Sequence, residues 1–210
     1  MSNLAILIPS YNEINNLLKI IKKLKNYNVL IVDDGSFKKI EKKIQVSSKL
    51  KIVRNNTNKG YEYSLLRGFK ILKKKFKYIL TMDADGEHSI SNINKSYIYC
   101  KKNKIDLLIG SRSRMNRFSE KYISKLFFKK YNIRDPLSGF KIYNSKKLSK
   151  IIKDYKLKKN YLFDILFLFL KKKYKVKNYN IKSGKIPIRK SSFPNFETNI
   201  KILSLSKYLI

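Results

Sequence analysis

Cysteine and tryptophan are nearly absent from this sequence of 210 residues, which contains one cysteine and no tryptophan. A single cysteine excludes an internal disulfide. The cysteine is Cys100, and its setting in SYIYCKK is typical of a buried or half-buried helix position rather than of a nucleophile. We therefore expect a protein of a reducing, cytoplasmic compartment.

Long apolar runs are also missing. The longest run, 161–170, is interrupted by Asp164, whereas a helix needs about 20 apolar residues to cross a bilayer. The apolar run 4–9 is too short for a signal peptide, and no basic region precedes it. The sequence thus predicts neither a membrane-spanning helix nor a signal peptide.

Acidic residues are few: 14 stand against 49 basic residues, which gives a formal net charge of +35. Only seven of the basic residues are arginine, and the lysines recur in nearly every predicted helix instead of forming one block. This distribution argues against a specific nucleic-acid site, where arginine is favoured. Two explanations stay open: solvated helix faces in a sequence biased toward Lys, Asn and Ile codons, or attraction to an anionic membrane surface.

Glycine and proline are scarce too, with seven and four residues, and no Gly/Ser linker or internal repeat is present. A hydrophobic content of 43% over this length is enough for one core, so we expect a single domain. Apolar runs alternate with helical patterns, which predicts a doubly wound, mostly parallel α/β sheet flanked by helices. The predicted strands are 4–9, 28–32, 50–54, 77–82 and 105–110, and the predicted helices are 13–26, 37–47, 61–75, 90–103, 119–131 and two more that end near Lys173.

Three carboxylates follow the predicted strand 77–82 in the segment TMDADGEH. They are Asp83, Asp85 and Glu87. Mg²⁺ and Mn²⁺ take oxygen ligands and often share them with substrate phosphates, so a few carboxylates on one turn suffice when a diphosphate completes the shell. The alternative is a simple turn between a strand and a helix.

Two further strands end in polar residues, in ILIPSYNE (6–13) and VLIVDDGS (29–36). In open α/β sheets, ligands bind in the crevice outside the carboxyl ends of the strands. We therefore expect one crevice to gather polar side chains from all three strand ends. The candidates are Tyr11, Glu13, Asp33, Asp34, Asp83 and Asp85.

Taken together, the motifs resemble a known family. PSYNE, VDDGS, NKG (58–60), DADG, GSR (110–112) and DPLSGFK (135–141) occur in the order of family 2 glycosyltransferases, over roughly residues 4–190. Within that family the chain is most similar to dolichol-phosphate and polyprenol-phosphate sugar transferases, such as the mannosyltransferases. The resemblance implies the GT-A fold, with a nucleotide-sugar-binding half (1–112), an acceptor half (113–190) and a C-terminal tail (191–210), which we expect to be amphipathic.

The resemblance also implies roles for individual residues. Asp83 and Asp85, with Ala84 between them, would face the donor diphosphate through Mg²⁺ or Mn²⁺, with Glu87 as a third ligand. Asp85 and Arg112 are the expected catalytic residues, Arg112 as a clamp for a donor or lipid phosphate. His88 is expected in a supporting role. The other expected substrate-binding residues are Pro9, Tyr11 and Glu13 for base and ribose, Val32, Asp33 and Asp34 beside them, and Arg134, Asp135 and Arg189; Arg114 and Arg117 are further cationic candidates.

Two segments depart from the family pattern. Leu166 occupies a position where the family usually has a glutamate. After IPIR the family's basic, glycine-containing loop is replaced by KSSFPNFE, so Arg189 and Lys190 are only substitutes for its lysine.

The expected activity is metal-dependent, inverting sugar transfer from a GDP- or UDP-linked sugar to a polyprenyl phosphate. We expect it at the cytoplasmic face of a membrane, to which the protein binds peripherally. The alternatives are a family 2 enzyme with a saccharide acceptor, and a basic nucleotide-sugar-binding protein without turnover.

Overall fold

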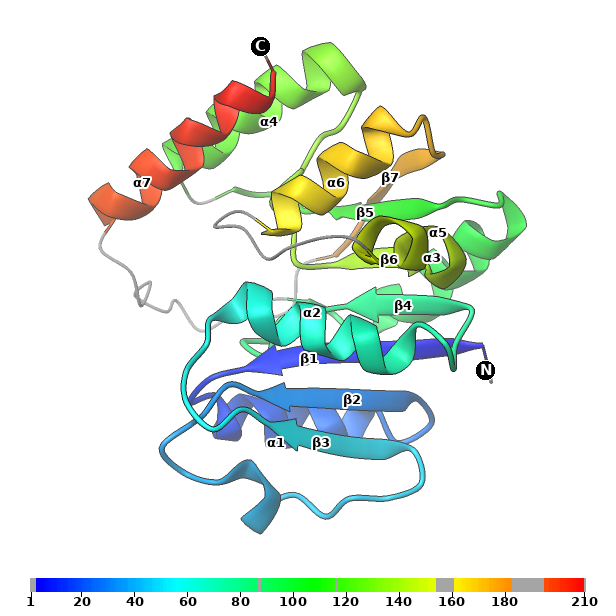
Figure 1. The fold of residues 1–210 in the computed structure, drawn as a ribbon, viewed down its shortest axis with the longest axis vertical. Helices are drawn as coiled ribbons and strands as arrows, with labels where there is room; N and C mark the ends of the chain where they lie inside the picture. The colour runs from blue at the N-terminus through cyan, green and yellow to red at the C-terminus, as the bar shows by residue number, and fades with distance from the viewer. Residues whose placement is uncertain (1–2, 87, 116, 154–160, 183–194, 210) are drawn as a thin grey trace.

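A computed structural model describes residues 3–86, 88–115, 117–153, 161–182 and 195–209, in which seven strands form one sheet (Figure 1). The strand order is β3-β2-β1-β4-β6-β5-β7. The strands are β1 (Leu4–Ser10), β2 (Asn28–Asp33), β3 (Leu50–Arg54), β4 (Tyr78–Thr81), β5 (Leu107–Ser111), β6 (Lys141–Asn144) and β7 (Val176–Asn180). The helices are α1 (Ile14–Lys23), α2 (Tyr61–Leu72), α3 (Ser91–Lys102), α4 (Phe118–Tyr131), α5 (Ser145–Ile152), α6 (Tyr161–Lys171) and α7 (Asn195–Leu203), with short 3-10 turns η1 (Ile40–Lys42) and η2 (Ser204–Tyr208).

All neighbouring strands run parallel except β6, which is antiparallel to both β4 and β5. The expected mostly parallel, doubly wound α/β fold is confirmed. The sequence pattern predicted neither β6 nor β7. β6 has only four residues, and β7 is partly exposed and rich in polar residues, so neither has the apolar run of a buried parallel strand.

Helices cover both faces of the sheet, and each face has its own core (Figure 1). β1 shows why: all seven of its residues are buried, and alternate side chains point into opposite cores. Leu7 belongs to the core that α2, α4, α5, α6 and α7 share on one face. Ile6 packs with residues of α1 and α3 on the other, as does the buried Cys100.

The predicted helix 37–47 is wrong, because the structure has only the three-residue turn η1 there. Two like-charged pairs at helical spacing, Lys38 with Lys42 and Lys39 with Lys43, would destabilise a helix. Only Ile40 and Ile44 of this segment are buried, so little packing opposes that repulsion.

The C-terminal segment lies along α4 (Figure 1). Ile202 of α7 and Leu205 of η2 are buried in the same core as α4. The division of the chain at residues 112 and 190 stays a prediction. None of the helices within the described ranges is both long and apolar enough to traverse a bilayer.

Candidate functional site

The carboxyl ends of β1, β2, β4 and β5 meet at one edge of the sheet, because these strands run parallel. Tyr11, Asp34, Asp83 and Arg112 follow these strands directly or within two residues. β6 runs in the opposite direction, so it begins at this edge, and Lys141 lies in register with Thr81. The loop before β6 is thereby placed against the DADG turn.

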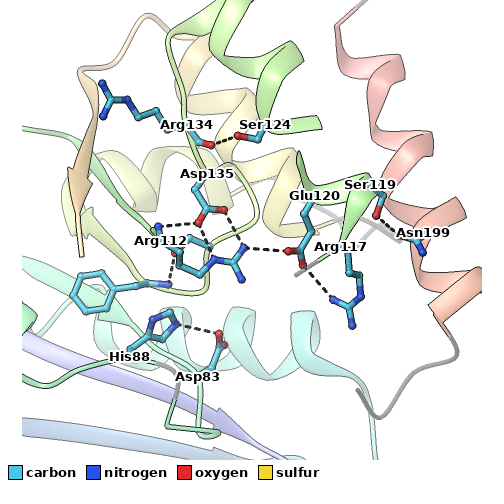
Figure 2. A network of polar contacts seen from close by, with 12 residues as sticks. Asp83, His88, Arg112, Arg117, Ser119, Glu120, Ser124, Arg134, Asp135 and Asn199 are labelled. Atoms are coloured by element: carbon cyan, nitrogen blue, oxygen red, sulfur yellow. Dashed lines mark hydrogen bonds and ion pairs between the residues drawn. The ribbon is translucent and has the colours of Figure 1, made fainter. Parts of the chain in front are cut away.

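Asp83 is held by two side chains. The Tyr61 hydroxyl donates a hydrogen bond to Asp83 Oδ1 at 2.6 Å. His88 Nε2 lies 3.3 Å from Asp83 Oδ2 (Figure 2). Burial alone would raise the pKa of Asp83, but the contacts with His88 and Tyr61 and the charge of Arg112 outweigh it and hold that pKa below its ordinary value. Asp83 is therefore ionised at neutral pH. His88, itself almost fully buried, has the supporting position expected from the sequence.

Asp83 and Asp85 fit a divalent cation. Both side chains are partly exposed, and they stand two residues apart on a turn that ends at Gly86. In the described part of the chain no group of three or more His, Cys, Asp or Glu side chains gathers at one point, and Glu87 lies outside the described residues. Two carboxylates completed by a diphosphate form a normal oxygen shell for Mg²⁺ or Mn²⁺.

Gly139 contacts Asp83 so closely that a side chain at this position would displace the Asp83 carboxylate. A Cβ atom on Gly139 would stand 2.0 Å from Asp83 Oδ2. The loop is fixed at this position because the Thr81 hydroxyl donates to the Gly139 carbonyl at 2.8 Å. Gly139 belongs to the DPLSGFK motif, but its contact joins segments far apart in the sequence, so sequence reasoning assigned it no role.

Lys141 is the second residue of this motif that the sequence analysis left without a role. Its side chain is almost completely buried, and its ammonium group donates to the Ser138 carbonyl. Burial lowers the pKa of Lys141 to about 8, although the nearby charges of Asp135 and Asp83 oppose the shift. The available signal was a lysine within the apolar segment GFKIY, unlike the lysines of the helix surfaces.

Arg112 forms a buried ion pair (Figure 2). Its Nε donates to Asp135 Oδ2 at 2.8 Å, its Nη2 donates to Asp135 Oδ1 at 3.1 Å, and its side chain is only 10% exposed. Glu120 joins the network, 3.8 Å from Arg112 and 3.2 Å from Arg117. The phosphate contact of Arg112 stays a prediction. A phosphate would bind a guanidinium that already donates to Asp135.

The remaining arginines lie elsewhere. The side chain of Arg134 points away from the Arg112–Asp135 pair in Figure 2, and its guanidinium lies over the Phe128 ring. Arg114 is exposed. Arg189 and Lys190 lie outside the described residues. Among the candidate arginines that the structure describes, only Arg112 and Arg117 share a partner, Glu120.

Removing the carboxylate of Asp135 should lower the free energy of unfolding by about 3 kcal/mol, because it leaves the largely buried Arg112 guanidinium without its main partner. Denaturant unfolding of Asp135→Ala measures this. Glu41→Ala, which removes an exposed carboxylate, is the control and should change stability by less than about 0.5 kcal/mol. Equal stability of the two variants would contradict a structural role for the pair.

The predicted base and ribose contacts lie at the ends of β1 and β2. Pro9 and Val32 are buried side by side in register, and Ala84 is also buried. Tyr11 is 39% exposed and faces the ring of Phe37. Glu13 precedes α1 and accepts a hydrogen bond from Asn16.

The two aspartates at the end of β2, Asp33 and Asp34, are already bound within the protein. Asp33 accepts hydrogen bonds from Ser36 and pairs with Arg54. Asp34 accepts from Asn55 and from the backbone of the NKG loop, at Lys59 and Gly60. Their predicted ligand contacts are untested, and both carboxylates hold the loops that frame this side of the site.

Comparison with known proteins identifies the family. Residues 5–175 match the model of glycosyl transferase family 2. The chain is 30% identical to an uncharacterised protein of Methanocaldococcus jannaschii, over 94% of this chain and 88% of that one. It is 25% identical to the dolichyl-phosphate beta-glucosyltransferase of Dictyostelium discoideum, over 95% of this chain and 71% of that one.

A solved structure shows the same fold. Glucosyl-3-phosphoglycerate synthase from Mycobacterium tuberculosis, in complex with Mn²⁺, uridine diphosphate and phosphoglyceric acid, superposes with a TM-score of 0.75 at 13% identity. The superposition covers 99% of this chain and 78% of that one. Together with the family match, it confirms the resemblance seen in the motifs. The chain therefore belongs to glycosyl transferase family 2 and is a glycosyltransferase with the GT-A fold.

Proposed function

We propose that this glycosyltransferase moves a sugar from a nucleotide-diphospho-sugar to a polyprenyl phosphate at the cytoplasmic face of a membrane. The observation that carries the proposal is the pairing of opposite charges at one sheet edge. Asp83 is held ionised, two residues before Asp85, and the charges of Arg112 and Lys141 act on Asp83. Such a site suits a reaction in which both the donor and the acceptor carry phosphate.

On the donor side, the nucleotide would lie over the ends of β1 and β2, near Pro9, Tyr11 and Val32. A divalent cation held by Asp83 and Asp85 would offset negative charge on the leaving diphosphate. Tyr61 and His88 fix the orientation of Asp83, so this carboxylate needs no rearrangement when the donor binds. The Mn²⁺ and uridine diphosphate of the mycobacterial structure support this part of the proposal.

On the acceptor side, Leu166 stands where the family usually has a glutamate. This difference favours a phosphate acceptor over a sugar hydroxyl. A sugar hydroxyl must lose its proton as it attacks, which calls for a general base. A phosphate monoester has a second pKa of about 6, so its oxygen is already largely ionised at neutral pH. Leu166 is buried in the core and His88 contacts Asp83, so neither supplies a base. The name of the Dictyostelium relative supports a polyprenyl phosphate.

The test offers the purified protein a short, water-soluble polyprenyl phosphate and the corresponding free alcohol, each with Mn²⁺ and a panel of GDP- and UDP-sugars. We expect transfer to the phosphate and at least about a hundredfold less to the alcohol, since only the phosphate attacks without a base. Release of nucleotide diphosphate and mass analysis of the product measure both reactions. Comparable transfer to the alcohol or to a simple sugar would refute the acceptor while leaving the family unchanged.

A further inference from the structure

Large apolar side chains are exposed on α4 and α7, which lie side by side (Figure 1). On α4 these are Phe118, Tyr122 and Phe128, of which Phe118 is 78% exposed. α7 adds Phe196, 76% exposed, with Ile200 and Leu203. We call these six residues the α4–α7 face.

The exposed apolar side chains of each helix lie on one side of that helix. On α4 the apolar residues of the face alternate with exposed lysines at helical spacing, and no acidic residue stands among these exposed positions. The lysines are Lys121, Lys125 and Lys129. On α7 the spacing of 196, 200 and 203 places all three apolar residues on a single stripe.

The two helices are fixed so that these sides form a continuous surface. Ser119 near the start of α4 hydrogen-bonds Asn199 of α7, and Lys130 near its end donates to the Leu209 carbonyl. The start of α4 thus contacts residue 199 and its end contacts residue 209, so α4 and the C-terminal segment run parallel. Ile123 of α4 and Ile202 of α7 are both buried in the core beneath them. The opposite sides, which carry the α4–α7 face, therefore point outward together.

We propose that the α4–α7 face is the surface by which this enzyme sits on an anionic lipid bilayer. The exposed aromatic and aliphatic side chains suit the apolar lipid chains, and the lysines between them suit the anionic headgroups above those chains. Each lysine near an anionic surface strengthens binding roughly fivefold. The net charge of +35 adds a long-range attraction to the same partner. Charge complementarity thus favours lipid over a protein partner.

A pocket opens on the same side of α4, and its assignment to a lipid phosphate rests on the proposed function. The pocket has a volume of about 380 Å³ and is lined by Met115, Lys121, Ser124, Lys125, Phe128 and Arg134. Cationic and apolar walls suit a lipid that carries a phosphate. The Arg134 side chain lines the pocket, and the next residue of the chain, Asp135, pairs with Arg112 on the other side of the backbone. A lipid phosphate bound in the pocket would thus lie one residue along the chain from the Arg112–Asp135 pair.

The test is flotation of the whole protein with two kinds of vesicle, phosphatidylcholine alone and phosphatidylcholine with about one quarter phosphatidylglycerol. Binding should require the anionic lipid at about 0.1 M salt and weaken at about 1 M salt, where the Debye length falls from ~10 to ~3 Å. Phe118→Ser/Phe196→Ser/Ile200→Ser and, separately, Lys121→Glu/Lys125→Glu/Lys129→Glu should each weaken binding at least roughly tenfold.

The matched controls lie on α3, on the opposite face of the sheet. Ile98→Ser, which removes a residue that is 63% exposed, and Lys95→Glu/Lys101→Glu/Lys102→Glu should bind vesicles nearly as the unaltered protein does. Thermal unfolding confirms that each variant is folded. Unaltered vesicle binding by folded α4–α7 variants would overturn the proposal, as would a dimer of the unaltered protein that these variants dissociate.

A second readout separates this inference from the proposed function. The apolar α4–α7 variant should turn over a water-soluble polyprenyl phosphate at the unaltered rate but lose at least roughly tenfold with a long-chain acceptor embedded in vesicles. Failure of the unaltered protein with the soluble acceptor would refute the proposed function. Equal loss with both acceptors would refute the membrane-docking role alone.

Discussion

Replacing Asp85 with asparagine should lower the rate of sugar transfer at least about a thousandfold and leave the fold intact. The substitution removes a negative charge from a partly exposed turn, where a divalent cation would be worth several kcal/mol of charge stabilisation in the transition state. Steady-state kinetics over a range of Mn²⁺ concentrations, together with thermal unfolding, measures both effects. EDTA should abolish the activity of the unaltered protein, and added Mn²⁺ should restore it.

Asp106→Asn is the matched control, because Asp106 lies beside the start of β5, at the opposite end of the strands, and accepts a hydrogen bond from the Lys175 backbone that asparagine can also accept. Its activity should be nearly unchanged. If Asp85→Asn keeps full activity in metal-free buffer, Asp85 is not a metal ligand.

Gly139→Ala should reduce activity at least about a hundredfold and lower the free energy of unfolding by about 2 kcal/mol. The new methyl group would meet the Asp83 carboxylate at 2.0 Å, and this carboxylate is held by Tyr61 and His88. Asp83 must therefore rotate away and give up at least one of these contacts. Kinetics and denaturant unfolding report the two losses separately.

A double-mutant cycle tests whether this contact is the cause. In an Asp83→Ala background the methyl group of Gly139→Ala has no carboxylate to displace. The second substitution should then lower the free energy of unfolding by less than about 0.5 kcal/mol. An equal cost in both backgrounds would show that Gly139 is needed for its backbone and not for its closeness to Asp83.

Part of the site could be predicted from sequence because parallel strands bring their carboxyl ends to one edge. The apolar runs before PSYNE, VDDGS and DADG marked β1, β2 and β4, and the carboxyl ends of these strands do lie at one edge of the sheet. The rest depends on contacts between distant segments. Lys141 and Gly139 approach Asp83 only because β6 pairs with β4, and a four-residue strand carries too weak a pattern to reveal that pairing.

The sequence also did not reveal which candidate side chains bind other parts of the protein. Asp33 and Asp34 looked alike as candidates for ligand contacts, yet their carboxylates bind loops of the protein itself. Arg112 was expected to meet phosphate and has a buried partner, Asp135, 23 residues further along the chain. The failed helix 37–47 has a local cause, since its lysines stand at spacings that repel within a helix.

The place of β4 in the sheet also affects when the catalytic site assembles during folding. Neither neighbour of β4 is close in sequence: β1 pairs Leu4 with Tyr78, and Thr81 and Lys141 of β4 and β6 are 60 residues apart. Pairings of such separation close large loops and form slowly, whereas β1, β2 and β3 join through short connections. A refolding chain would thus regain its helices and the pairing of β1, β2 and β3 before Asp83 meets Gly139, and activity would recover later than this secondary structure.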